Sequence, residues 1–108
     1  MTDQTVTLAQ LKEHIRSFSD VRGWLEGENA KDLAMALSVE AAELSEIFMW
    51  LHSDRADAVK DDPREFEHLQ EELADVFCRI CQHFHIDLAK AVEDKTEKNA
   101  RKYPAPQK

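Results

Sequence analysis

The longest apolar pattern in the chain runs along residues 30–51 and repeats at helical spacing. When successive residues are placed about 100° apart, one face of this helix is apolar. Its members are Leu33, Leu37, Leu44, Ile47, Phe48 and Leu51. Glu40 falls in the middle of this face, and Glu43 lies one turn further on, at its edge. A carboxylate on a buried face is costly unless it is neutralised, paired or bound to a metal ion.

Three other segments show the same periodicity, and each begins at a residue suited to cap a helix. Asn29 precedes the long helix, while Thr7, Asp62 and Asp87 precede the other three. Pro63 fits the first helical position after Asp62. The predicted helices therefore cover residues 8–21, 30–51, 63–84 and 88–102.

Turn-forming residues are scarce, with only two Gly and three Pro, and no stretch alternates as a strand does. The pattern predicts an all-α, four-helix bundle-like fold, and the length of 108 residues predicts a single domain over 1–108. Residues 1–6 and 105–108 are expected to be flexible ends. The polar segment 52–61 is expected to be a loop or a short, frayed helix.

The composition limits which classes of molecule the chain is expected to bind. The formal net charge of −8 argues against a nucleic-acid polymer or an anionic membrane surface as the partner. The sequence shows neither a signal-peptide pattern nor an apolar run of transmembrane length, so the expected compartment is the cytoplasm.

A second acidic pair matches the first. Glu72 and Asp75 border the apolar face of the helix predicted at 63–84, with the same spacing of three residues as Glu40 and Glu43. Residues three apart on a helix point the same way, so each pair can offer oxygens to one ion. Carboxylate ligands suit a hard cation such as Mg²⁺, with Mn²⁺ as the other candidate. The plainer alternative is that all four acids are surface or ion-pair residues.

Two other kinds of metal site are each partly compatible with the sequence. A di-iron carboxylate site needs Glu-x-x-His on two helices, and only Glu65 and His68 have that spacing. A zinc site could use Cys78, Cys81 and His85, but a fourth ligand is not apparent. The alternative for the cysteines is a stripe of small residues, with Ala74, suited to close packing of another helix.

Besides the acidic pairs, several aromatic, cationic and amide side chains are candidates for ligand binding. Trp24 and Trp50 suit either packing against the core or stacking on a flat ligand. On the last predicted helix, Lys95, Asn99 and Lys102 continue the line of its apolar residues. These side chains either solvate the helix end or bind a phosphate chain.

Three spaced motifs together resemble a known family. They are Leu37 to Trp50 with Glu40-x-x-Glu43, then Leu69 to Val76 with Glu72-x-x-Asp75, and then Lys95-x-x-x-Asn99-x-x-Lys102-Tyr103-Pro104. In this order and spacing, the chain is similar to the MazG-type nucleotide pyrophosphohydrolases over about residues 18–104. It is most similar to their small dCTP-pyrophosphatase-like branch.

The resemblance implies an all-α, Mg²⁺-dependent homodimer or homotetramer that cleaves nucleoside triphosphates between the α and β phosphates. The role implied is the removal of unwanted deoxynucleotides. Carried onto this chain, the metal ligands are the four acids, with Glu40 and Glu43 as the candidate catalytic residues. The phosphate-binding residues implied are Lys95, Asn99, Lys102 and Tyr103, and the base-binding residues are Trp24 and Trp50.

The chain departs from this branch where polar residues read the base. Ile15 or Glu28 stands at that place, with His14 adjacent to Ile15. The preferred nucleotide therefore stays open, with dCTP or a modified deoxynucleotide as candidates. The alternative function is a non-catalytic helical dimerisation or regulatory module.

Overall fold

The computed structural model describes residues 1–24, 26–83 and 86–106, without the side chains of residues 82 and 83. All regular structure in these ranges is helical, which confirms the all-α prediction. The elements are α1 (Leu8–Asp20), α2 (Ala30–Met49), the 3₁₀ helix η1 (Ser53–Asp61), α3 (Pro63–His83) and α4 (Leu88–Lys102). Each predicted boundary agrees with these within two residues.

The predicted caps form the expected hydrogen bonds. Side-chain oxygens at Thr7, Asn29, Asp62 and Asp87 each accept from a backbone N–H two or three residues further on, at 2.9–3.1 Å. At α1 the bond is reciprocated, because the Gln10 side chain accepts from the Thr7 N–H at 2.8 Å. These bonds satisfy donors that the first turn of a helix leaves without partners.

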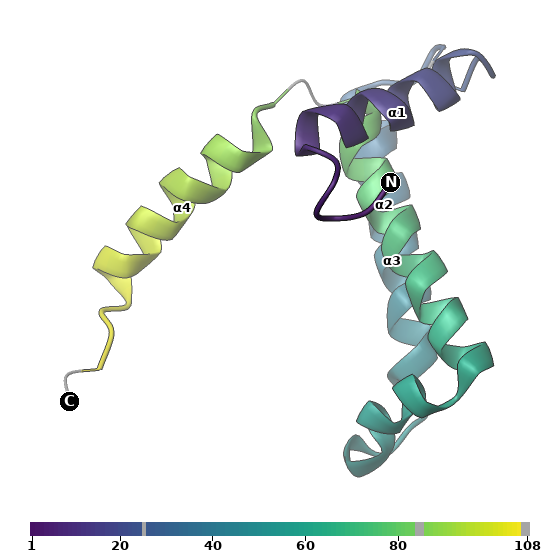
Figure 1. Ribbon diagram of the computed structural model, residues 1–108, viewed down its shortest axis with the longest axis vertical. Coiled ribbons are helices and arrows are strands. Elements are labelled where there is room, and N and C mark those ends of the chain that lie inside the picture. Colours follow the sequence, from purple (N-terminus) through teal and green to yellow (C-terminus); the bar gives the residue numbers. More distant parts are fainter. Residues whose placement is uncertain (25, 84–85, 107–108) are drawn as a thin grey trace.

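The centre of the molecule is an antiparallel pair of helices. Helices α2 and α3 lie side by side, joined at one end through η1, and α1 crosses their other end (Figure 1). Arg16 ties α1 to α3, since its Nε donates to the Cys81 carbonyl at 3.1 Å. The buried core is small and includes Ile15, Leu33 and Val59, of which Leu33 is fully enclosed.

Helix α4 extends away from this pair (Figure 1). Every residue of α4 except Leu88 is exposed, and the helix carries its own ion pairs, including Arg101 with Glu97 at 2.8 Å. The radius of gyration is 17.1 Å, whereas a compact domain of this length has about 13 Å. None of the described helices combines the length and apolar character that a membrane crossing requires.

Much apolar surface stays uncovered in the single chain. Of the predicted apolar face of α2, Leu33 is fully buried, while Leu37 and Leu44 are only partly buried. On the side of α2 that faces away from this face, Met35 and Val39 lie one turn apart and are more than half exposed. Exposed apolar side chains that neighbour one another are typical of a protein–protein interface.

Candidate functional site

The acidic pairs meet where α2 faces α3. One carboxylate oxygen from each of Glu40, Glu43 and Glu72 lies within 4.8 Å of the other two. Asp75, the fourth predicted ligand, lies one turn beyond Glu72 on α3 and lines the cavity next to Glu40. The antiparallel packing of two helices thus brings three of the four predicted ligands together, with the fourth adjacent.

Two of these carboxylates are half satisfied. Glu40 Oε1 lies 3.5 Å from Arg79 Nε, and Glu72 Oε1 lies 3.4 Å from His68 Nε2. The Glu40 and Glu72 side chains are only 14% exposed, and the Oε2 atom of each is buried with no hydrogen-bond partner among the described residues. A buried carboxylate oxygen without a partner is costly, and a cation removes that cost. The donor set, all carboxylate oxygen, fits a divalent cation such as Mg²⁺ or Mn²⁺.

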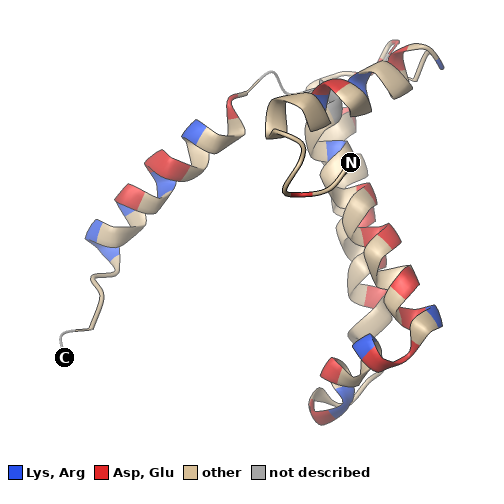
Figure 2. Ribbon diagram, viewed as in Figure 1, with Lys and Arg blue, Asp and Glu red and all other residues tan. Residues whose placement is uncertain are grey.

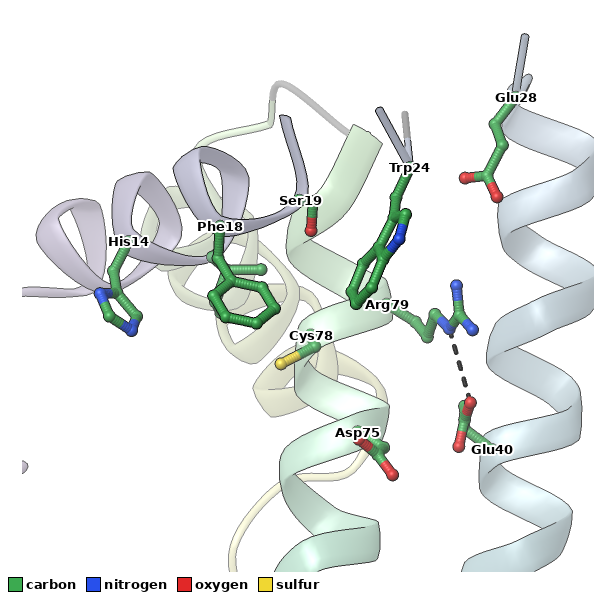
Figure 3. Close-up of a pocket in the computed structure, with 10 residues that line it drawn as sticks. His14, Phe18, Ser19, Trp24, Glu28, Glu40, Asp75, Cys78 and Arg79 are labelled. Carbon is green, nitrogen blue, oxygen red and sulfur yellow. Dashed lines mark ion pairs between the residues drawn. The ribbon is translucent and has the colours of Figure 1, made fainter. Parts of the chain in front are cut away.

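A cavity of about 690 Å³ adjoins this acidic cluster, between α1, α2 and α3. Figure 3 shows Asp75 and Glu40 at one end of it, and Trp24 and Glu28 at the other. Ile15, Phe18 and Cys78 contribute to its wall. The cavity has an acidic end and an aromatic end, which is the arrangement required by a ligand with both phosphates and a flat ring.

The aromatic end is held by a small cluster of rings. Trp24 packs edge to face on Phe18 with the ring centroids 5.7 Å apart, and the Arg22 guanidinium lies 3.5 Å from the Phe18 centroid. The turn that brings Trp24 back onto α1 passes through Gly23, whose φ of +68° is one that side-chain-bearing residues rarely adopt. Trp24 is 53% exposed, so one part of its ring is open to a ligand.

Glu28 adds a polar group at the same end. It directly precedes the Asn29 cap of α2, and its Oε2 atom is buried without a hydrogen-bond partner among the described residues. In Figure 3 its carboxylate points into the space beside Trp24. An acceptor without a partner in a cavity favours a ligand that brings a donor.

The cysteine pair does not resemble a prepared metal site. Cys78 and Cys81 are free thiols, and His85, the third predicted zinc ligand, lies outside the described residues. Burial raises the pKa of both thiols, and Asp75 and Glu40 raise that of Cys78 further while Arg79 lowers it. A thiol with a raised pKa stays protonated at neutral pH, and zinc is bound by the thiolate.

Several predicted site residues lie away from this cavity. Trp50 caps the end of α2 remote from Trp24 and is 87% exposed. The four predicted phosphate-binding residues lie on or just after α4 and are exposed; they are Lys95, Asn99, Lys102 and Tyr103. Figure 2 shows that α4 carries charges of both signs at a distance from the acidic residues of α2 and α3.

Arg79 is a cavity residue that was not predicted from the sequence. It follows Asp75 by four residues, so it lies on the same face of α3, and this spacing was a usable signal. Phe18, Ser19 and Cys78 also line the cavity. Ser19 carries no sequence pattern of its own, because only the crossing of α1 over α3 brings it to this place.

Comparison with known proteins gives a consistent result. No family model matches the chain. Among curated proteins, dCTP pyrophosphatase 1 of Rattus norvegicus is 32% identical over 101 residues, and that of Homo sapiens is 33% identical over 102 residues. These matches cover 91% and 92% of this chain but only 59% and 60% of the relatives, so the chain spans about three fifths of their length.

A solved structure matches over its whole length. A pyrophosphatase from Archaeoglobus fulgidus is 38% identical, with a TM-score of 0.82, and the match covers 97% of this chain and 99% of the archaeal one. The acidic motifs, the all-helical fold and these relatives agree. The chain belongs to the MazG-like nucleotide pyrophosphohydrolase family, in the branch that includes the dCTP pyrophosphatases.

Proposed function

We propose that the chain is a nucleoside triphosphate pyrophosphohydrolase that requires a divalent cation, with Mg²⁺ as the expected ion. It hydrolyses the bond between the α and β phosphates and releases a nucleoside monophosphate and pyrophosphate. The observation that carries the proposal is the acidic cluster of Glu40, Glu43 and Glu72 next to a cavity that Glu40 lines and whose other end holds Trp24.

The metal ligands in this proposal are Glu40, Glu43, Glu72 and Asp75. A divalent cation bound there supplies positive charge that neutralises the phosphate oxygens and orients them for displacement. Two of these acids have a buried oxygen without a partner, which supports their use as ligands. A nucleotide with its own negative charge binds here only with such neutralisation, because the acids alone repel it.

The reaction is an in-line displacement at the α phosphorus. The oxygen of a water molecule attacks, the bond from the α phosphorus to the bridging oxygen breaks, and pyrophosphate leaves with the bonding electrons. A carboxylate of the cluster, Glu40 or Glu43, takes up the proton that the water loses. Holding the water and the phosphate in this geometry is the main contribution of the chain's own residues.

The base lies at the aromatic end of the cavity. The exposed part of the Trp24 ring stacks on it, and the Glu28 carboxylate accepts a hydrogen bond from an exocyclic amino group. A carbonyl at the same place on the base would face a carboxylate and be rejected. Cytosine carries an amino group there and uracil a carbonyl, and the curated relatives are named for dCTP, so dCTP is the expected substrate.

The complete site includes a second copy of the chain. The exposed apolar side chains of α2, Met35 and Val39 among them, form the surface expected to be covered in a homodimer or homotetramer. Because Lys95 and Asn99 lie on a helix that extends away from its own cavity, they reach the phosphates bound by a neighbouring copy. Trp50, at the end of α2, is likewise expected to reach the cavity of a neighbouring copy. Family membership favours this enzyme over a non-catalytic helical module.

The test is hydrolysis of a panel of ribo- and deoxynucleoside triphosphates with Mg²⁺ and with EDTA, with products separated by chromatography. Monophosphate and pyrophosphate, formed only with the metal, are expected, with dCTP the best substrate. Diphosphate and inorganic phosphate as products would contradict the assigned bond cleavage. Absence of turnover for every nucleotide would contradict the enzymatic function.

A further inference from the structure

We propose that Arg79 exchanges partners when the site fills. Without a metal ion, Arg79 pairs with Glu40. Once a divalent metal ion has bound the Glu40 carboxylate, the guanidinium turns to the α-phosphate of the nucleotide. This inference rests on the proposed function for its second half only. Its first half, competition between Arg79 and a cation for the same carboxylate, concerns the protein without nucleotide.

Arg79 of α3 and Glu40 of α2 form an ion pair between the two helices. Arg79 Nε lies 3.5 Å from Glu40 Oε1, and the two side chains are 32% and 14% exposed (Figure 3). The same carboxylate belongs to the acidic cluster with Glu43 and Glu72. The guanidinium therefore occupies one oxygen of a predicted metal ligand and partly neutralises a cluster that otherwise repels itself.

A cation and Arg79 compete for Glu40. A divalent ion in the cluster attracts the Glu40 carboxylate more strongly than a partly exposed guanidinium does, because it carries twice the charge. A partly exposed ion pair contributes little to stability, so breaking the Arg79–Glu40 pair costs little free energy. Arg79 makes a further interaction besides the Glu40 pair.

The destination follows from where Arg79 lies along the cavity. It is one turn beyond Asp75 on α3, on the side of the acidic cluster that faces Trp24. If the terminal phosphates lie at the acids and the base at Trp24, this point of the cavity holds the α-phosphate and sugar. A guanidinium presents paired donors that match two phosphate oxygens, which favours the α-phosphate as its new partner.

The experiment measures two quantities that should move in opposite directions. Mn²⁺ binding to the nucleotide-free protein is followed by calorimetry, and the KM for dCTP is measured at saturating metal. For Arg79→Gln we expect Mn²⁺ to bind about three- to tenfold more tightly, because the guanidinium that competes for Glu40 is absent. We also expect the KM to rise about tenfold, because the contact to the α-phosphate is lost. Arg64→Gln, an exposed arginine in the first turn of α3, removes the same charge and should change neither.

Arg79→Lys keeps the charge but not the paired donors. It should bind Mn²⁺ as the wild type does and still show a raised KM, and it carries the test if Arg79→Gln fails to fold by circular dichroism. Unchanged or weaker Mn²⁺ binding in Arg79→Gln, or in Arg79→Lys an unchanged KM, overturns the exchange. A wild-type protein that binds Mn²⁺ but turns over no nucleotide contradicts the proposed function instead, and the Mn²⁺ comparison still decides the competition with Arg79.

Discussion

The α2–α3 pair and α4 make an instructive contrast, because both carry residues of the predicted site. In α2 and α3 the acids converge, with oxygens of Glu40, Glu43 and Glu72 within 4.8 Å of one another. In α4 the residues Lys95 and Asn99 are equally regular along their helix but lie in solvent. The difference teaches that one chain alone brings the predicted metal ligands together, whereas it leaves the predicted phosphate-binding residues of α4 in solvent.

The largest expected effect comes from breaking the acidic half. Glu72→Gln removes a charge from the cluster, so Mn²⁺ binding should be lost and turnover should fall by about 100-fold or more. The fold should be kept or slightly stabilised, because like-charge repulsion falls. Calorimetry, steady-state kinetics and thermal melting check the three effects.

The matched control is Glu71→Gln, at the exposed neighbouring position on the same helix. It removes the same charge outside the cluster and should leave metal binding and turnover unchanged. Full activity in Glu72→Gln would remove Glu72 from the site.

Substitutions on α4 should lower turnover without affecting metal binding. Replacing Lys95 and Asn99 together by Ala should lower kcat/KM about 10- to 100-fold, since each contact to a charged phosphate is worth about 1.5–3 kcal/mol and only part of it is lost. Mn²⁺ binding without nucleotide should not change, because the acids are intact. Lys98→Ala, an exposed lysine on the same helix, is the control. Equal kinetics in the double variant and the wild type would show that α4 takes no part in the site.

A smaller effect sharpens the aromatic end of the cavity. Glu28→Gln gives the side chain a donor as well as an acceptor, so the ratio of kcat/KM for dCTP to that for dUTP should fall about tenfold. The pair dATP and dITP differs by the same exchange of amino group for carbonyl and shows whether the ring size matters as well. Glu26→Gln, exposed in the same loop, should keep the wild-type ratio. An unchanged dCTP/dUTP ratio in Glu28→Gln would exclude Glu28 as the base-reading group.

The smallest effect concerns pH and the α3 wall of the cavity. Burial raises the pKa of the Cys78 thiol above its ordinary value of 9.0. Above pH 9 the unfolded chain therefore loses this proton while the folded chain keeps it, so the free energy of unfolding falls as pH rises. Between pH 8 and pH 10 the melting temperature of Cys78→Ala should fall less than that of the wild type. Parallel curves for the two proteins would contradict the raised pKa.

Sequence reasoning worked best where local chemistry decides the outcome. The N-caps at Asn29 and Asp87 predict where α2 and α4 begin, and the apolar periodicity that follows each cap predicts where the helix ends. Both ends agree with the structure within two residues. The acidic pairs were found because Glu40 interrupts an apolar face, and a buried charge needs a reason. Each of these signals lies within one helix.

What the sequence could not provide depends on how helices cross. Ser19 lines the cavity only because α1 lies over α3, and no periodicity predicts that crossing. The pairing of Arg79 with Glu40 joins residues on two helices, 39 positions apart in the chain. The direction of α4 was also beyond the sequence, because its ion-paired surface is compatible with either a packed or an extended helix.

Mixing two impaired variants tests most directly whether the acidic residues and α4 of one site come from different copies. One variant carries Glu72→Gln, and the other carries Ala at both Lys95 and Asn99. If a site takes its acids from one copy and its α4 from another, mixed oligomers contain some sites with both halves intact. Mg²⁺-dependent hydrolysis of dCTP should then exceed the sum of the separate activities after the variants are mixed and allowed to exchange subunits. With subunit exchange verified by mass spectrometry, activity no greater than that sum would contradict a site shared between copies.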